Sequence, residues 1–384
     1  MLEHHPSTAA RWRRRAVQTA IAVSLVAAIA PAAASAQRGP TDLGGPLAGP
    51  TRDILEPPPR NGEILNDHVL TLPFNAFGFP STTAAANIVV DRDSGDVLGS
   101  KSPDMRWAPA STTKIMTGLL AVEAIDAGTV SLNDTVTIQS DVDIEGGGSL
   151  GLSPGDTISL RDLLNIALIE SKNDAAAAVG TYVGSQPGND PSWMGRAAFV
   201  QAMNDRAAEL GLTNTRYVNI AGRDPEDLGD DHANPAAPGF GFWPTQVDCE
   251  DNEFNHPPCG HYTTARDLAA LARVALDEPR FATIVGRNSF RTTTWRSAAG
   301  AVLDYTLDST NQLLPGEPLA YTGAYGVKTG TSHMAGENLV SAASNAAPDT
   351  GDVIAVVLGS DDDARTIADR FSDSRALLDW GLDR

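Results

Sequence analysis

Short apolar runs of strand length lie near both ends of the part of the chain that has regular hydrophobic patterning. Residues 85–90 and 97–100 are two such runs, and the polar segment 91–96 between them is rich in Asp, Ser and Gly. Two apolar runs joined by a turn of this composition predict a β-hairpin. Further strands are predicted late in the chain, over residues 325–331, 338–343 and 353–359.

Between these strands the apolar residues recur at the three- and four-residue spacing of amphipathic helices. This pattern predicts helices over residues 112–127, 160–170, 174–183, 194–210 and 264–276, and a last one over residues 362–380. Strands at both ends with helices between them favour an α+β fold. We expect a central antiparallel sheet built from the N- and C-terminal strands and packed with helices, plus a mostly helical lobe. The functional site is expected where these two parts meet.

The N-terminus is expected to lie outside this fold. Four arginines between positions 11 and 15 precede an apolar run over residues 16–30, and small residues follow at 34–36. This layout predicts a secretory signal peptide over residues 1–36, and therefore an exported protein, periplasmic or extracellular. An uncleaved membrane anchor is the alternative, although the apolar run is short for a spanning helix. Residues 37–81 are rich in Pro and Gly and are interpreted as a linker.

Residues 223–261 interrupt the periodic pattern and are interpreted as a long surface insertion. Cys249 and Cys259, the two cysteines of the chain, both lie in it. In an oxidising compartment they are predicted to form a disulfide, and two free thiols are the alternative. The insertion also contains a cluster of possible metal ligands whose spacing matches no calcium loop, so we expect a solvated acidic surface and no metal. These residues are Asp224, Glu226, Asp227, Asp230, Asp231 and His232.

The overall composition limits the choice of partners. The chain has 48 acidic residues against 28 Lys and Arg, and its formal net charge is −20. No basic surplus is present to neutralise phosphates, so we expect no nucleic-acid partner. A hydrophobic content of 42% is normal for a globular protein, and the negative charge helps to keep such a protein dispersed.

The chain contains only four lysines, and three of them occur in short motifs. Ser111 and Lys114 form the first motif, and their three-residue spacing at the start of a predicted helix places both side chains on one face. An arginine keeps its proton near neutral pH, whereas a neutral lysine amine can serve as the base that activates a serine. Burial, or a second cation such as Lys328, would lower the pKa of Lys114 in the required direction. An ordinary helix-start serine with an exposed lysine is the alternative.

Ser171, Lys172 and Asn173 form the second motif, which lies between two predicted helices. Ser171 is a candidate for relaying a proton from Lys114 to a leaving amine. Asn173 is a candidate for holding Lys114 and for bonding a peptide group of the substrate. A turn or a helix cap is the more common role of a Ser-x-Asn triplet. Lys172 is expected to point to solvent, and Asp174 to cap the following helix.

Lys328, Thr329 and Gly330 form the third motif, on a predicted strand. A strand edge can pair with an extended peptide, and Gly lets the peptide backbone approach closely. Lys328 and Thr329 together are a candidate seat for a substrate carboxylate. The backbone N–H groups of Thr331 and Ser111 are candidates for an oxyanion hole, in which one donor typically contributes about 10²–10³ in rate.

These three motifs in this order are a known signature of penicillin-binding proteins and class A β-lactamases. The chain resembles the serine D-alanyl-D-alanine carboxypeptidases, which are low-molecular-mass penicillin-binding proteins. The likeness covers roughly residues 82–384, which are therefore predicted to form the catalytic domain, with the insertion at 223–261. It is carried by residues 106–117, 171–175, 210–219, 262–269 and, most strongly, 326–340. Lys172 stands where most members of this family have Gly.

This resemblance implies a β-lactamase-like fold and a substrate, the D-Ala-D-Ala end of peptidoglycan stem peptides. Ser111 would attack the penultimate carbonyl, release D-Ala and form an acyl-enzyme that water hydrolyses. β-Lactams would be covalent inhibitors of the same serine, and no cofactor is expected. Many relatives carry a second, β-rich C-terminal domain and an amphipathic tail that docks on the membrane. This chain stops after one terminal helix, so neither is expected here.

Three other functions share some or all of these motifs. A serine β-lactamase needs a positioned Glu for deacylation, and the nearest candidate, Glu209, is better interpreted as the end of a helix. A D,D-endopeptidase or transpeptidase would use every residue named above and differ only in the acceptor. A cell-wall binding protein without activity is the alternative of another class, although the motifs are intact in this chain.

Overall fold

The computed structural model describes residues 78–140, 148–186, 192–224, 260–345, 351–360 and 369–384. All of them belong to one compact unit, Thr71–Arg384. The predicted signal peptide, nearly all of the predicted linker and the central part of the predicted insertion lie outside the described residues. Cys249 and Cys259 lie there too, so the disulfide stays a prediction. None of the described helices has both the length and the apolar character that crossing a bilayer requires.

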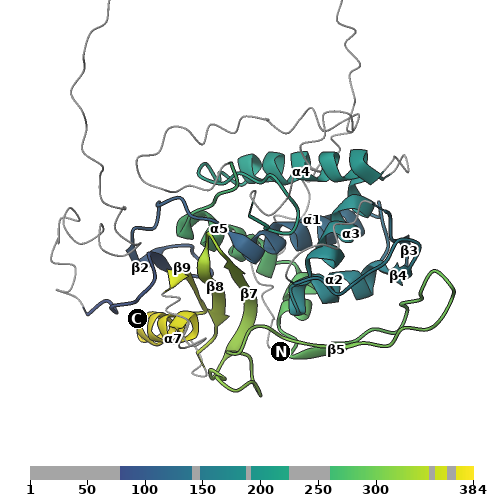
Figure 1. Cartoon of the computed structure of the whole chain (residues 1–384). Helices are drawn as coiled ribbons and strands as arrows, with labels where there is room; N and C mark the ends of the chain where they lie inside the picture. Colours follow the sequence, from purple (N-terminus) through teal and green to yellow (C-terminus); the bar gives the residue numbers. More distant parts are fainter. Residues whose placement is uncertain (1–77, 141–147, 187–191, 225–259, 346–350, 361–368) are drawn as a thin grey trace, which may run out of the picture. The chain divides into compact units, whose positions relative to one another are not determined.

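An antiparallel sheet with the strand order β2-β1-β9-β8-β7 forms the centre of the described structure (Figure 1). β1 and β2 form the predicted hairpin, and β1 also pairs with β9, with Val89 opposite Ala355. The sheet therefore combines the early hairpin with the late strands, as predicted. β7 is the last strand of the order, so its outer edge pairs with no further strand of this sheet. The bounds are β1 Ala86–Asp91, β2 Val97–Lys101, β7 Ala324–Ser332, β8 Gly336–Ala343 and β9 Val353–Ser360.

The helices predicted from periodicity are present, and their described ends differ from the prediction by at most two residues. The exception is the start of the last helix, which is described only from Asp369. The short helix α6 and four three-residue strands were not predicted, because elements of this length show no periodicity. The helices are α1 Lys114–Asp126, α2 Leu160–Ile169, α3 Asn173–Gly184, α4 Ser192–Glu209, α5 Ala265–Leu276, α6 Pro279–Val285 and α7 Asp369–Leu382. The short strands form two hairpin-like pairs, β3 Thr135–Thr137 with β4 Thr157–Ser159, and β5 Ser289–Arg291 with β6 Thr306–Asp308.

Different helices cover the two faces of the sheet, because successive side chains of a strand point to opposite faces. In β1, Ile88 and Val90 belong to a large core that includes apolar residues of α1, α5 and α6. Val89 points the other way and packs with Phe371 and Leu377 of α7, which is yellow in Figure 1. Each fully buried aliphatic side chain contributes about 1.5–3 kcal/mol to this packing. The sheet thus lies between α7 and the helical part of the molecule, which confirms the predicted α+β architecture.

Candidate active site

The first motif lies in a tight turn between the sheet and α1. Ala110–Thr113 form a 3-10 helix instead of the first turn of the predicted α-helix, and α1 begins at Lys114. Asn338 of β8 donates a hydrogen bond from Nδ2 to the Pro109 carbonyl at 3.2 Å. This bond ties the turn to the sheet and leaves Ser111 half-buried beside it.

The amine of Lys114 is fully buried, with an exposed fraction of 0%, and has three hydrogen-bond partners. Lys114 Nζ lies 2.9 Å from Ser111 Oγ, 2.7 Å from Asn173 Oδ1 and 2.7 Å from the Ala221 carbonyl oxygen. The last two partners are oxygens that only accept. A neutral amine has two N–H groups and one lone pair, so Asn173 and Ala221 use both of its protons. The lone pair then faces Ser111 Oγ, which can donate its hydrogen to it.

The surroundings of this amine favour its neutral form. Burial holds the pKa of Lys114 well below its usual range, and the positive charge of Lys328 lowers it further. The carboxylate of Asp174 acts in the opposite direction and is the weakest of the three causes. The burial that the sequence could only require as a condition is therefore present in the structure.

The second motif reaches Lys114 from the turn between α2 and α3. Ser171 adopts a φ of +68°, in the left-handed region, and so turns the chain sharply just before α3. Asn173, two residues later, contacts Lys114 as described above. The prediction that Lys172 points to solvent is wrong, since its side chain is only 20% exposed and its Nζ lies 3.4 Å from Glu170 Oε1.

Asp174 has a larger structural role than the predicted helix cap. α3 begins one residue earlier, at Asn173, with Lys172 as its N-cap. The buried carboxylate of Asp174 accepts hydrogen bonds from the backbone N–H groups of Leu150, Gly151 and Leu152, at 2.8 to 3.0 Å. It therefore fixes the loop before β4 against the second motif.

The third motif lies on β7, and its lysine is also buried, with an exposed fraction of 1%. Lys328 Nζ donates to the Thr329 carbonyl at 3.0 Å, and the Thr329 hydroxyl lies 2.6 Å from that of Thr310. Burial, and secondly the charge of Arg370, lower the pKa of Lys328 to about 7. Both lysines thus have lowered pKa values, and Lys328 lies close enough to lower the pKa of Lys114 through its charge.

Gly330 lets this strand approach the turn that carries Ser111. A Cβ atom at Gly330 would lie 3.1 Å from both the Pro109 carbonyl oxygen and the Thr112 nitrogen, which is tighter than ordinary contact. The side chain of the next residue, Thr331, is exposed. The close approach brings the third motif against the first.

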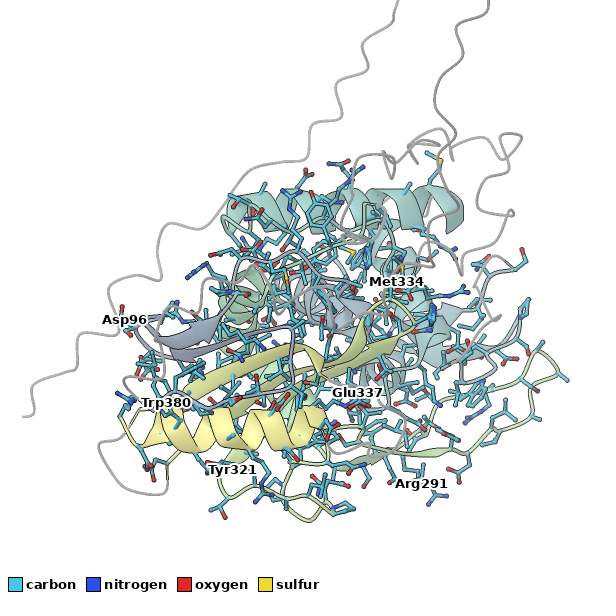
Figure 2. The ribbon with its side chains drawn as sticks, turned by 60° about the vertical axis from the view of Figure 1, so that its left-hand side comes forward. Asp96, Arg291, Tyr321, Met334, Glu337 and Trp380 are labelled. Carbon is cyan, nitrogen blue, oxygen red and sulfur yellow. The ribbon has the colours of Figure 1, made fainter. Side chains whose placement is uncertain are left out.

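A cation from the opposite face of the sheet completes this arrangement. Arg370 of α7 donates from Nη1 to the Gly330 carbonyl at 3.1 Å and to Thr331 Oγ1 at 2.7 Å. Its Nη2 forms an ion pair with Glu337 at 3.2 Å. Figure 2 shows Glu337 near α7, on the side of the sheet that this helix covers. Arg370 therefore supports the end of the third motif and adds positive charge beside Lys328.

Of the acidic cluster in the predicted insertion, the structure describes only Asp224. Asp224 is buried and accepts hydrogen bonds from Ser332 Oγ at 2.8 Å and from the Met334 N–H at 2.9 Å, in the turn labelled by Met334 in Figure 2. The other five members lie outside the described residues. Among the residues that the structure describes, no group of three or more His, Cys, Asp and Glu side chains is arranged to hold a metal ion.

Sequence reasoning missed the residues that act on the motifs from far away in the chain. Arg370, Thr310 and Ala221 carry no local signal, because each contributes through a contact that folding creates. Ala221 contributes only a backbone carbonyl, which any residue type would supply.

Comparison with known proteins agrees with this geometry. Residues 75–362 match the D-alanyl-D-alanine carboxypeptidase family (Peptidase_S11). The chain is similar to D-alanyl-D-alanine carboxypeptidase DacC of Escherichia coli, with 33% identity over 79% of this chain and 62% of the relative. DacF of Bacillus subtilis is 29% identical over 78% of this chain and 62% of the relative. The chain thus spans less than two thirds of the length of these curated relatives.

A solved structure shares the fold over nearly its full length. The Streptomyces K15 DD-transpeptidase is 27% identical, with a TM-score of 0.62 over 79% of this chain and 99% of that chain. The three motifs, their contacts and the match over residues 75–362 lead to one assignment. The chain belongs to the D-alanyl-D-alanine carboxypeptidase family of serine peptidases.

Proposed function

We propose that the protein is a serine-type D-Ala-D-Ala carboxypeptidase that removes the terminal D-Ala from peptidoglycan stem peptides. The observation that carries the proposal is the buried amine of Lys114, 2.9 Å from Ser111 Oγ. Its other two partners only accept hydrogen bonds, so the neutral amine can take the proton of Ser111. The lowered pKa of Lys114, caused mainly by burial, supports this role as a general base.

In the acylation step, Ser111 Oγ forms a bond to the carbonyl carbon of the penultimate D-Ala while Lys114 Nζ accepts the hydroxyl proton. The N–H groups of Ser111 and Thr331 stabilise the oxyanion of the tetrahedral intermediate. The proton then passes through the Ser171 hydroxyl to the nitrogen of the terminal D-Ala. The C–N bond breaks, free D-Ala leaves, and the acyl group stays on Ser111. Water hydrolyses this ester and regenerates the serine.

The carboxylate of the substrate's terminal D-Ala is assigned to the third motif. Lys328 supplies a positive charge at pH values below about 7, and the hydroxyl of Thr329 supplies a hydrogen bond. Arg370 adds a guanidinium that keeps its charge throughout the physiological range. A β-lactam also carries a carboxylate beside its reactive carbonyl, so it would occupy the same seat and acylate Ser111.

Transfer of the acyl group to an amine instead of water is the second candidate. Its support is the likeness to a structure named DD-transpeptidase, which this chain covers over 99% of its length. A β-lactamase is less well supported, because Glu209 is at the end of α4, is 65% exposed and pairs with Arg206. A cell-wall binding protein without activity would not require a buried lysine base.

Release of free D-Ala from a synthetic pentapeptide ending in D-Ala-D-Ala is the test. We expect release by the wild-type protein and none above background by Ser111→Ala, because the acyl-enzyme cannot form. The same variant should lose covalent labelling by a fluorescent penicillin. A wild-type protein that neither releases D-Ala nor takes the label would contradict the proposal. Transfer of the acyl group from Ser111 to an added amine acceptor, without hydrolysis of the acyl-enzyme, would favour the transpeptidase.

We also propose export and a Cys249–Cys259 disulfide, on the basis of the N-terminal pattern and the spacing of the two cysteines. Protein recovered from outside the cytoplasm is expected to begin after residue 36 and to contain no free thiol. Intact mass measurement before and after reduction and alkylation checks both points. Two alkylated cysteines without prior reduction would show that the disulfide is absent.

A further inference from the structure

The segment 217–224 lies along the helix that carries the proposed base, and two of its carbonyls bind that helix. The Ile220 carbonyl accepts a hydrogen bond from Thr117 Oγ1 at 2.7 Å. The next carbonyl, that of Ala221, accepts from Lys114 Nζ at 2.7 Å. One partner of Lys114 is therefore a main-chain oxygen, whose position depends on how this segment is folded.

Asn219 folds the segment around this carbonyl. Its Oδ1 accepts hydrogen bonds from the N–H groups of Gly222 at 2.7 Å and Arg223 at 3.0 Å. Its Nδ2 donates to the Arg223 carbonyl at 2.8 Å. The three bonds close a turn whose middle residue is Ala221. No other described side chain makes three hydrogen bonds to the backbone of this turn.

The turn is pressed against the nucleophile turn at a position that tolerates only glycine. Gly222 has a φ of +83°, in the left-handed region, and a Cβ atom there would lie 1.8 Å from the Ala110 carbonyl oxygen. The Ala221 carbonyl therefore reaches Lys114 from a segment in direct contact with the residue before Ser111. This arrangement leaves the turn little freedom to shift while Asn219 holds it.

We propose that Asn219 is a positioning residue for the base, acting through the Ala221 carbonyl on the amine of Lys114. The neutral amine keeps its lone pair on Ser111 only while both of its N–H groups are held. Asn173 holds one and Ala221 holds the other. When the Ala221 carbonyl moves away, the amine rotates about its carbon–nitrogen bond and the lone pair leaves the serine.

The turn also affects the charge state of Lys114. The groups that act on this amine are the cation of Lys328 on β7 and the carboxylate of Asp174 on α3, while burial is the largest influence. Opening the turn would admit water to the amine and remove part of that burial, so the pKa of Lys114 would rise. The proposal deepens the proposed function, and the charge of Lys114 can be measured whether or not the protein hydrolyses a peptide.

The test compares three variants with the wild-type protein. Asn219→Ala removes all three bonds, and Asn219→Asp keeps the acceptor but adds a negative charge. Asn204→Ala is the matched control, because Asn204 also binds the backbone of this segment. Its side chain accepts from the Tyr217 N–H at 2.9 Å and donates to the Tyr217 carbonyl at 2.8 Å, five residues before Gly222. Each variant is checked for folding by its melting temperature.

Two readouts are used. The first is the pH dependence of acylation by a fluorescent penicillin. The second is the titration of Lys114 by NMR of protein labelled with ¹³C at the lysine ε-carbon. The chain has only four lysines, so Lys114→Arg assigns the signal directly.

We expect Asn219→Ala to lower the acylation rate at its pH maximum by about 10- to 100-fold and to raise the pKa of Lys114. Asn219→Asp should restore most of the maximal acylation rate. The acid side of its pH profile and the pKa of Lys114 should both move to higher pH because of the added negative charge. Asn204→Ala should lower the melting temperature and leave both readouts unchanged.

The proposal is overturned if Asn219→Ala keeps the wild-type maximal acylation rate and the wild-type pKa of Lys114, or if Asn204→Ala changes both as strongly. If Asn219→Ala does not fold, Asn219→Asp decides, and an unchanged Lys114 pKa in that variant counts against the proposal. A wild-type protein that is never acylated, combined with the expected NMR shifts, would reject the proposed function and leave the positioning role standing.

Discussion

Replacing Lys114 with arginine is expected to reduce acylation of Ser111 by about 10³-fold or more. The variant keeps a positive charge at the position but loses the neutral amine, because a guanidinium does not give up its proton near neutral pH. The lone pair that faces Ser111 Oγ across 2.9 Å therefore disappears. The measurement is the second-order rate of labelling by a fluorescent penicillin, followed from about pH 5 to 10.

The pH profile separates loss of the base from a simple shift of its pKa. In the wild-type protein the rate should rise with pH on the acid side of its profile, because Lys114 acts only when it is neutral. The lowered pKa of Lys114 moves this rise to lower pH. The arginine variant should show no such rise. Lys101→Arg is the control, since the exposed Lys101 of β2 donates to the Ala84 carbonyl at 2.7 Å and is not part of the site. Wild-type turnover in Lys114→Arg would remove Lys114 from the mechanism.

Lys328→Ala is expected to lower kcat/KM for substrates with a free terminal carboxylate far more than for the corresponding amides. The difference should be about 10- to 100-fold. The positive charge that faces the carboxylate is lost, while an amide never depended on it. Lys328→Met is the matched variant, because it removes the charge but fills most of the buried volume. Equal losses for acid and amide substrates in both variants would contradict the carboxylate role.

The lowered pKa of Lys328 adds a pH dependence with a defined sign. Lys328 is a cation below pH about 7 and loses its charge as the pH rises through that value. The preference of the wild-type protein for carboxylate substrates over amide substrates should therefore fall above neutral pH. The requirement for a neutral Lys114 has the opposite effect, because it makes the rate rise with pH. Together the two requirements give a bell-shaped pH profile of kcat/KM for the natural substrate. In Lys328→Met, removal of the charge next to Lys114 should raise the pKa of Lys114, so the rise of the rate on the acid side should move to higher pH.

The regular elements and the three motifs could be predicted because each depends on neighbours in the chain. The strands of the sheet and the long helices have hydrophobic patterns that repeat within one element. Ser111 and Lys114 are three residues apart, so local geometry alone suggested that they share a face. The local prediction was wrong where the folded turn gives a side chain a partner that the sequence pattern did not indicate. Lys172 pairs with Glu170 in the folded turn, and Asp174 binds the loop at 150–152.

The chain's pattern of apolar residues therefore specified the α+β fold, and its motifs specified which side chains carry the chemistry. The folded structure alone showed that Lys114 and Lys328 lie buried near each other, that Arg370 reaches the third motif from behind the sheet, and that Asn219 folds the turn at Ala221. The reason is physical. A pKa depends on the water and charges that all surrounding elements remove or supply, and these elements are brought together only by folding.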